Sequence, residues 1–464
     1  MSIGHIETAR LVAAVATLGG YAALCVAVAL VQRRKALAAA ARTRSLAGTG
    51  DARPLLVAHA SQTGAAEQIA WQTAQALHGA ARPVRVAPLG TLALDDLRAA
   101  SSVLIVASTC GEGDAPDGAA PFVRRLVERA DGGSLADVRY GLLALGDRGF
   151  ANFCAFGRRL DAWMLDGGAR PLFARIDVDG LRDADLARWK HELGRLANAG
   201  DALAWREPER QPWRLVRRTH ANPGSSGAPV FHLELEPPAG TAATWEAGDL
   251  LQVRVPDDPD RPRLYSIAST PAEGRAHLLV RQERRPDGRL GLASGWLTRD
   301  AEVGSPVMLG TVAHANFRLG DNAGRPLILI GNGTGIAGLR AHLSAQASRA
   351  RACEPTRNWL VFGERQAAHD FHFRSDVERW HAEGTIARLD LAFSRDQARK
   401  HYVQDRLRAQ PEAVRQWLDA GAAVYVCGSL QGMARGVDEA LTGIVGAARV
   451  EALIAEGRYR RDVY

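Results

Sequence analysis

Hydrophobic and polar positions alternate along this chain in blocks that predict strands and helices in turn. Short apolar runs at 53–60, 102–107 and 140–145 are each followed by a polar or Gly-rich turn and then by a helical stretch such as AAEQIAWQTAQAL. This β–α alternation is typical of a doubly wound parallel sheet, whose ligands bind at the carboxyl ends of the strands. Residues 52–200 are therefore predicted to form an α/β domain in which three loops meet at one edge.

The pattern changes around residue 212. The short alternating segments VFHLEL, DLLQVRV and AHLLVR predict an antiparallel β-barrel over residues 212–322. Over residues 323–464 apolar runs alternate with helices again, in PLILIGNG, NWLVFGE, RLDLAFS and AVYVCGS, which predicts a second parallel-sheet domain. A linker at 201–211 would join the first domain to the barrel. A length of 464 residues is too great for one core and agrees with this division.

The longest uncharged run lies near the N-terminus, at Leu11–Val31. At about 1.5 Å per residue a helix of this length spans about 31 Å, the thickness of the hydrocarbon core of a bilayer. RRK at 33–35 follows it, so the positive-inside rule places the rest of the chain in the cytoplasm. We expect a single-pass helix at 10–32 in the inner (cytoplasmic) membrane and a tether at 33–51. A cleaved signal peptide is the alternative, but this run exceeds the usual length of its hydrophobic region.

The composition excludes several kinds of site. The five cysteines form no CxxC pair and the thirteen histidines form no ligand cluster, so neither a disulfide framework nor a metal site is predicted. The net charge of +7 comes from dispersed arginines, without a basic stripe interleaved with aromatic residues. Nucleic-acid binding is therefore not expected.

Three loops at the predicted strand ends of the first domain carry residue types that suit an anion and a ring. SQTGAAE at 61–67 offers hydroxyls and backbone N–H groups at a helix N-terminus, which can surround a phosphate monoester. STCGEGDAPD at 108–117 and LGDRGFANFC at 145–154 stand at the ends of neighbouring strands. Together the three segments resemble the phosphate loop and the two isoalloxazine loops of flavodoxin-type FMN domains.

This resemblance implies FMN binding and names the residues that would do it. Phe150 matches the aromatic residue that stacks on the flavin, where an apolar neighbour buries the ring and tunes its potentials. A place for Phe150 in the core is the alternative. Cys110 stands where reductases of microsomal cytochromes carry Tyr. The implied FMN-binding residues are Ser61, Gln62, Thr63, Gly64, Ala65, Ala66, Ser108, Thr109, Cys110, Gly111, Leu145, Gly146, Asp147, Phe150, Phe153 and Cys154.

The barrel region carries RLYS at 263–266, which resembles the RxYS signature of the ferredoxin-NADP reductase superfamily. In that family the Arg meets the FAD pyrophosphate, which suits its planar fork of donors. The Tyr stacks on the flavin and the Ser lies by the reactive nitrogen of the flavin. GLASGWL at 291–297 matches the second pyrophosphate contact. The resemblance implies FAD binding by Arg263, Leu264, Tyr265, Ser266, Gly291, Leu292, Ala293 and Ser294, while a solvated surface charge is the alternative for Arg263.

The third domain begins with a glycine-rich turn after PLILI, where the backbone can approach a dinucleotide pyrophosphate. SRDQARKHYVQ at 394–404 resembles the segment that binds the 2′-phosphate of NADPH in the same superfamily. A phosphate favours Arg and Lys, whereas an NAD site places an acid on the ribose hydroxyls, so NADPH is predicted over NADH. The implied residues are Gly333, Thr334, Gly335, Ser394, Arg395, Lys400, Tyr402 and Gln404.

YVCGS at 425–429 and RDVY at 461–464 complete the set. In the family the matching Cys and Asp sit beside the nicotinamide, and the final aromatic residue lies on the FAD ring and moves aside for hydride transfer. The resemblance implies catalytic roles for Ser266, Cys427, Asp462 and Tyr464, with Tyr464 also binding FAD. Taken alone, Cys427 would be a buried small hydrophobic residue.

From Ser61 to Tyr464 the resemblance is continuous, and it is to the diflavin reductases, nearest in the C-terminal half to the flavoprotein subunit of bacterial NADPH-sulfite reductase. Relatives insert a helical connecting domain before RxYS, whereas this chain has only PDDPDRPR there. Gly338 stands where relatives have Pro, and Gly436 where they have an Asp that contacts the nucleotide.

The family resemblance implies an NADPH-dependent enzyme that passes electrons to FAD, then to FMN, and then to an external one-electron acceptor. The sequence has no haem-ligand motif and no Fe–S cysteine cluster, so the acceptor is expected on another molecule. The predicted anchor suggests a membrane-bound haem or iron-reducing partner. Two alternatives stay open: the flavoprotein subunit of an assimilatory sulfite reductase, and a flavin-less scaffold that uses the fold to bind proteins.

Overall fold

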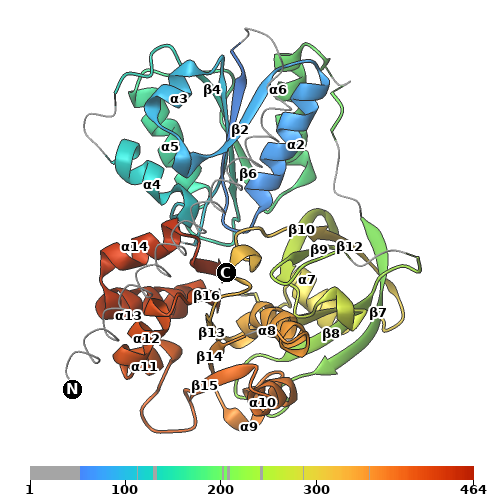
Figure 1. Ribbon diagram of the computed structural model, residues 1–464. Coiled ribbons are helices and arrows are strands. Elements are labelled where there is room, and N and C mark those ends of the chain that lie inside the picture. Colours follow the sequence, from blue (N-terminus) through green and yellow to red (C-terminus); the bar gives the residue numbers. More distant parts are fainter. Residues whose placement is uncertain are drawn as a thin grey trace, which may run out of the picture.

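The computed structural model describes residues 53–464, apart from 112, 129–132, 201–202, 206–209, 241–243, 286 and 355. The predicted membrane helix at 10–32 and the tether at 33–51 lie outside the described residues. None of the helices in the described part of the chain is long and apolar enough to cross a membrane. Three sheets define three domains, which meet near the C-terminus of the chain (Figure 1).

The first domain, at the top of Figure 1, is the doubly wound parallel sheet that the sequence predicts. Its strand order is β2-β1-β3-β4-β5, with β6 paired to β4. Both faces are covered because alternate residues of a strand enter opposite cores: Leu56 and Ala58 face one, Leu55 and Val57 the other. The elements are β1 (Leu55–Ala60), α2 (Ala65–Gly79), β2 (Val84–Pro88), α3 (Leu94–Ala99), β3 (Val103–Ser108), α4 (Ala120–Phe122), β4 (Arg139–Gly146), α5 (Ala155–Asp166), β5 (Arg170–Pro171), β6 (Ile176–Asp179) and α6 (Asp183–Ala197).

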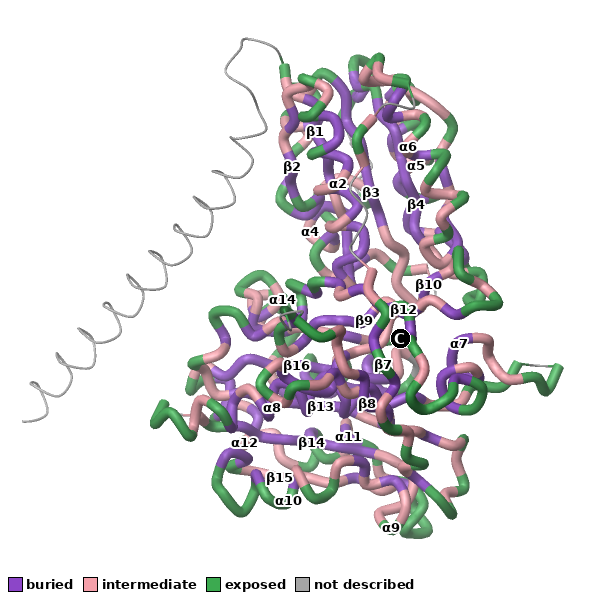
Figure 2. The backbone as a smooth tube through the Cα atoms, turned by 90° about the vertical axis from the view of Figure 1, so that its right-hand side faces the viewer, coloured by how far each residue is buried: buried purple, intermediate pink, exposed green. Residues whose placement is uncertain are grey.

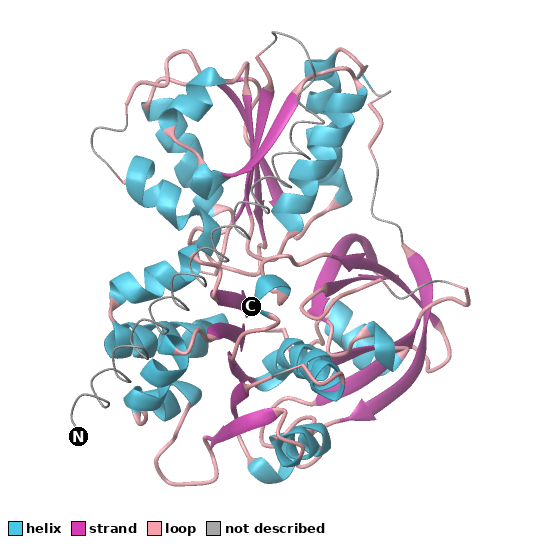
Figure 3. Cartoon of the chain, in the orientation of Figure 1, coloured by secondary structure: helices cyan, strands magenta, loops and turns pink. Residues whose placement is uncertain are grey.

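The middle domain is an antiparallel sheet in the order β10-β9-β12-β7-β8-β11, strongly curved in Figure 3. The closed barrel that the sequence predicts is not seen, because no ladder joins the edge strands β10 and β11 among the described residues. Helix α7 fills the core instead, where Ala293 packs with Trp213 and Leu251. The elements are β7 (Gln211–His220), β8 (Val230–Glu236), β9 (Leu250–Val255), β10 (Asp258–Ser266), β11 (Ala276–Arg281), α7 (Leu292–Gly295) and β12 (Pro306–Val312).

A hairpin between β9 and β10 occupies the place where the family resemblance leads us to expect a connecting domain. Asp258 pairs with Val255 and Arg263 with Val253, and the register shifts between these two pairs. PDDPDRPR is thus a tight turn and the first part of β10. As a result RLYS leaves the hairpin directly and ends the strand at Ser266.

The third domain is a parallel sheet in the order β15-β14-β13-β16-β17, with its inner strands β14, β13 and β16 buried between helices (Figure 2). Alternation along β13 again serves two cores, with Ile328 and Ile330 in one and Leu327 and Leu329 in the other. The elements are β13 (Leu327–Asn332), α8 (Ile336–Arg351), β14 (Asn358–Glu364), α9 (Ala367–Asp370), α10 (Arg374–Ala382), β15 (Ile386–Phe393), α11 (Val403–Arg408), α12 (Pro411–Asp419), β16 (Ala423–Gly428), α13 (Arg435–Val445), α14 (Ala447–Ala455) and β17 (Tyr459–Val463).

Candidate active site

A cavity of about 310 Å³ lies at the carboxyl edge of the first sheet, against strand β10 of the middle domain. All three loops predicted from the sequence reach it, and so does the start of RLYS. The predicted residues that line it are Thr63, Ala65, Ser108, Thr109, Gly111, Leu145, Gly146, Asp147, Phe150, Phe153, Cys154, Arg263 and Leu264. The structure therefore brings the two predicted flavin motifs to one cavity between two domains.

The chemistry of this cavity fits a flavin mononucleotide. Gly64, at φ 84°, immediately precedes the 15-residue helix α2, and the N-terminus of such a helix favours an anion such as a phosphate. Ser61 Oγ accepts the amide N–H of Ala66 at 3.2 Å and holds the loop closed. Thr109 Oγ1 is buried without a hydrogen-bond partner among the described residues, as expected of a group that meets a polar ligand edge. Phe150 is 41% exposed, so it is not a core residue and its ring is free to cover a ligand.

Two of the predicted residues turn away from this cavity. Gln62 Nε2 donates to Asp117 Oδ2 at 2.9 Å and to the carbonyl oxygen of Arg461 at 3.2 Å. The thiol of Cys110 lies 3.8 Å from Gln62 Oε1. Burial raises the pKa of this thiol above its ordinary value. Both side chains face the third domain instead, and Cys110 does not cover the second face of the cavity as a Tyr would.

The predicted phosphate loop, 61–67, also accepts hydrogen bonds from the middle domain. His314 Nε2 donates to the carbonyl oxygen of Gln62 at 2.9 Å, and Asn316 Nδ2 donates to that of Ser61 at 2.9 Å. A Cβ atom placed on Gly64 would lie 2.5 Å from the carbonyl oxygen of Ala313. Only glycine therefore allows this loop and the 313–316 segment to approach so closely.

We expect Gly64→Ala to lower FMN affinity about tenfold, because alanine is strained by roughly 1–2 kcal/mol in the left-handed region and also meets the Ala313 oxygen. The ratio of FMN to FAD released from the purified protein measures the effect. Gly118→Ala is the matched control in the same domain, since its Cβ would have no atom within 4 Å. A normal FMN content in the Gly64 variant would show that the loop tolerates a side chain.

Three predicted catalytic residues, from β10, β16 and β17, lie together where the middle and third domains meet. Ser266 Oγ, at the end of β10, donates to Asp462 Oδ2 of β17 at 2.6 Å. Cys427 Sγ, near the end of β16, lies 3.6 Å from the same oxygen. Asp462 is 2% exposed, so this carboxylate is held by its two neighbours rather than by water. Burial and the nearby Asp462 charge raise the pKa of the Cys427 thiol well above its usual value, which keeps the thiol protonated as a donor.

Tyr464 stands at the outer side of this cluster. Its hydroxyl lies 3.1 Å from Thr334 Oγ1 in the glycine-rich turn, and 52% of the residue is exposed. The turn itself packs closely on β16, since a Cβ on Gly335 would lie 2.1 Å from the carbonyl oxygen of Cys427. Among the described residues, the side-chain hydrogen bond of Tyr464 is this one to Thr334, made at an exposed surface.

A second cavity, of about 450 Å³, lies at the carboxyl ends of the strands of the third domain. Four of the predicted nucleotide residues line it: Ser394, Arg395, Tyr402 and Gln404. Gln404 Oε1 is buried without a partner in the described structure, which fits a site for a polar ligand. Lys400 is exposed and is not part of the lining.

Sequence reasoning missed several residues of this second cavity, among them Arg281, Asn332, Glu364, Arg365 and Met433. Glu364, which ends NWLVFGE, and Arg365, which follows it, could have been found, because the ends of parallel strands meet at one edge. Arg281 could not, since it reaches the cavity from β11 of the middle domain, where it pairs with Glu364 at 2.8 Å. Burial raises the pKa of Glu364 despite this partner.

Gly338 and Gly436, the two glycines that depart from the pattern of the resembled family, lie beside Cys427 and beside Gln404. A Cβ on Gly338 would lie 3.1 Å from the Phe317 ring and 3.3 Å from Cys427 Sγ, so this glycine leaves room beside the thiol. A Cβ on Gly436 would lie 2.9 Å from Gln404 Nε2. The Gln404 amide therefore occupies the space into which an Asp at 436 would project.

The predicted second FAD pyrophosphate segment forms the short helix α7. Gly291 precedes it, and Ala293 and Ser294 are buried. Ser294 Oγ accepts the N–H of Glu283 at 3.1 Å. This contact ties the segment to the loop that follows β11.

Comparisons with known proteins agree with this geometry. The flavodoxin family model matches residues 57–190, and the model for the oxidoreductase NAD-binding domain matches residues 329–439. The flavoprotein alpha-component of NADPH sulfite reductase from Mannheimia succiniciproducens is 28% identical to this chain, over 88% of this chain and 89% of its own length. The same component from Photobacterium profundum is 26% identical, over 88% and 89% of the two chains.

The matched segments coincide with the two cavities. The flavodoxin match covers the loops around the first cavity, and the NAD-binding match covers most of the second. These similarities do not support the alternative of a flavin-less scaffold. The chain is an NADPH-dependent flavoprotein oxidoreductase that uses FMN and FAD, and its similarities support a place among the diflavin reductases.

Proposed function

We propose that the chain is a membrane-tethered reductase that takes electrons in pairs from NADPH and delivers them singly to an acceptor on another molecule. When bound, NADPH supplies a hydride to FAD, and FMN delivers single electrons outward. One observation carries the proposal. RLYS begins in the cavity of the FMN loops, at Arg263 and Leu264, and ends at Ser266 beside Asp462.

The side chains of this chain supply binding and orientation. Arg395 and Ser394 offer a cation and a hydroxyl to the 2′-phosphate of NADPH in the second cavity. Asp462 orients Ser266, and its buried carboxylate would stabilise positive charge on a nicotinamide bound beside it. The protonated Cys427 thiol restrains the same carboxylate. Tyr464 must leave its contact with Thr334 to admit the nicotinamide.

The membrane and the acceptor belong to the proposal as well. Leu11–Val31 is uncharged and long enough to span a bilayer, and RRK at 33–35 favours a cytoplasmic location for all three domains. We infer a single-pass protein of the inner membrane. Its acceptor is a membrane-bound haem protein or an iron-reducing partner, because a tether would keep the first domain near such a molecule.

A second candidate function is that of the flavoprotein subunit of an assimilatory sulfite reductase. The observation that favours it is the similarity to sulfite reductase flavoprotein components over 88% of this chain. In that case the acceptor is a soluble haemoprotein and the predicted anchor has no role in the reaction.

The test uses the full chain purified in detergent. We expect it to release FMN and FAD in equal amounts and to bleach when NADPH is added without oxygen. It should then reduce a ferric chelate or a co-purified membrane haem protein. Sulfide formation with added sulfite reductase haemoprotein would support the second candidate. Release of a single flavin, or no bleaching by NADPH, would contradict both.

A further inference from the structure

Two neighbouring residues of β17 contact different parts of the molecule. Asp462 contacts Ser266 of the middle domain, and Arg461 contacts Asp117 of the first domain. In the β16–β17 ladder Val426 pairs with Arg461 and Cys427 with Asp462. Successive side chains of a strand point to opposite sides. Asp462 accepts a hydrogen bond from Ser266, and we call Ser266, Cys427 and Asp462 the hydride-transfer cluster. Arg461 therefore faces the other way, toward the first domain.

Arg461 binds the first isoalloxazine loop at two points. Its Nε donates to Asp117 Oδ2 at 2.9 Å, and a second guanidinium nitrogen donates to Asp117 Oδ1. Gln62 of the phosphate loop donates to the same carboxylate and to the carbonyl oxygen of Arg461. The side chains of Arg461 and Asp117 are only 20% and 21% exposed. Such a two-point, partly buried pair fixes orientation better than a surface ion pair does.

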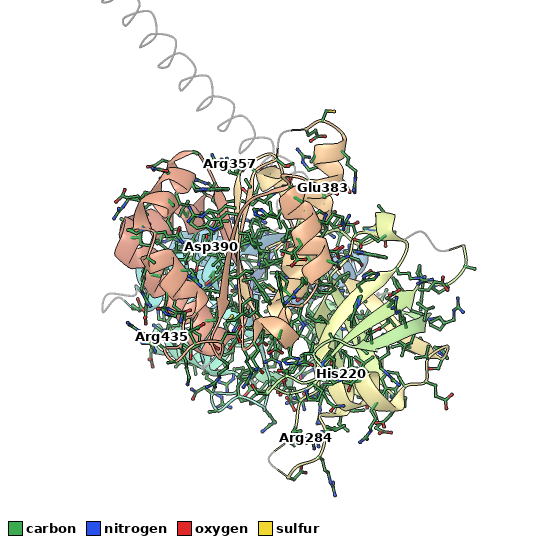
Figure 4. The ribbon with its side chains drawn as sticks, turned by 90° about the horizontal axis from the view of Figure 1, so that it is seen from below. His220, Arg284, Arg357, Glu383, Asp390 and Arg435 are labelled. Carbon is green, nitrogen blue, oxygen red and sulfur yellow. The ribbon has the colours of Figure 1, made fainter. Side chains whose placement is uncertain are left out.

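The boundary between the first and third domains is not completely filled beside this contact. A cavity of about 490 Å³ lies there, with Cys110, Leu430, Arg435 and Val463 among its walls. Arg435 is labelled at the left edge of the third domain in Figure 4. Another ion pair across the boundary, Arg124 with Glu451 at 3.3 Å, has side chains that are 52% and 53% exposed. Of these two ion pairs, the one through Arg461 is the more buried.

Arg461 is also tied to its own domain. It donates to Asp438, and the buried hydroxyl of Tyr459 donates to the other oxygen of that carboxylate. At the end of the strand, the amide of Leu430 donates to the carbonyl oxygen of Tyr464 at 3.0 Å. Leu430 in turn lies against Gly111 of the first domain, where a Cβ would have no room. The first domain thus contacts the end of the chain at two points: directly, through Asp117 and Arg461, and indirectly, through Gly111 and Leu430, whose amide binds Tyr464.

We propose that Arg461 is a positioning residue that couples the docking of the FMN domain to hydride transfer. While Asp117 holds Arg461, β17 is fixed and Asp462 stays set against Ser266. Without that ion pair β17 keeps its ladder with β16 and the hydrogen bond from Gln62 to the carbonyl oxygen of Arg461. The Arg461 side chain is then no longer fixed to the first domain, and the hydride-transfer cluster loosens. Docking of the first domain and nucleotide binding are both binding equilibria that act on the end of β17, so their coupling is reciprocal. Nucleotide binding that displaces Tyr464 therefore also weakens the docking. The inference rests on the proposed order of electron transfer from NADPH to FAD to FMN.

The test compares Asp117→Asn and Arg461→Gln with the wild type, in the full chain loaded with both flavins. Amide hydrogen exchange of the 459–464 peptide should be about fivefold faster in both variants, although residue 117 lies in another domain. Hydride transfer from NADPH under anaerobic stopped flow should be about fivefold slower in both. The double variant should be no slower than Arg461→Gln, because both changes remove the same contact. Arg461→Lys should recover part of the rate.

Arg124→Gln is the matched control, because it removes an ion pair across the same boundary without a contact to β17. It should leave both readouts unchanged. Wild-type exchange and hydride-transfer rates in Asp117→Asn would overturn the coupling. Bleaching of the wild type by NADPH, with two flavins bound, tests the proposed function separately, so the two ideas can fail independently.

Discussion

Asp462→Asn is expected to slow hydride transfer from NADPH by about 10²–10³-fold, which is the usual loss when one positioned electrostatic group is removed from a buried site. The carboxylate is 2% exposed and accepts Ser266 Oγ at 2.6 Å, so water cannot replace it. The amide keeps the shape of the side chain but carries no charge for the developing nicotinamide cation. Anaerobic stopped-flow reduction of the flavins measures the rate.

The control for this experiment is the integrity of the site. The variant should retain both flavins and bind 2′,5′-ADP, which lacks the nicotinamide, with little change, because the second cavity lies away from Asp462. A deuterium isotope effect on flavin reduction should grow as the hydride step becomes more rate-limiting. A rate within threefold of the wild type would remove Asp462 from the mechanism.

Arg395→Ala should raise the KM for NADPH about 10- to 100-fold, because a hydrogen bond between charged groups contributes about 1.5–3 kcal/mol. Arg395 lines the second cavity beside Ser394, where the 2′-phosphate is predicted to bind. The maximal rate should change little, since the phosphate is remote from the transferred hydride. Steady-state kinetics with NADPH and with NADH measure the effect.

NADH provides the internal comparison, because it lacks the phosphate and its KM should not respond to the change. Arg399→Ala is the matched control from the same loop, as Arg399 is exposed and does not line the cavity. If Arg395→Ala raised the KM for both nucleotides equally, the residue would be structural rather than a phosphate ligand.

The sheets of the first and third domains could be predicted because they depend on local patterns. Runs such as LLVAHA and LILIGN are apolar on both faces, which only a covered parallel strand tolerates. Loops at the ends of such strands meet by construction, so most of the predicted FMN and NADPH residues fall in the two cavities. The barrel was predicted less well, because a pattern of alternating residues indicates strands but not whether edges pair.

Contacts between domains could not be predicted. Arg261 pairs with Asp147 at 2.7 Å and with Asp179 at 3.1 Å, across the boundary between the first and middle domains. Nothing in the local sequence distinguishes Arg261 or Arg461 from the other members of a set of 58 lysines and arginines. Gln62 shows the same limit, since its place in SQTGAAE suggests a phosphate contact while its side chain binds Asp117.

By itself the sequence determined the order of the three domains, the glycine turns and the chemistry of each loop, because spacing along the chain sets strands, helix starts and side-chain types. The tertiary structure alone decided which loops share a cavity, that Ser266, Cys427 and Asp462 converge, and that Arg461 joins the last strand to the first domain. These depend on how separately folded sheets pack against one another. The surfaces that pack together combine residues far apart in the sequence, so they exist only once each domain has folded.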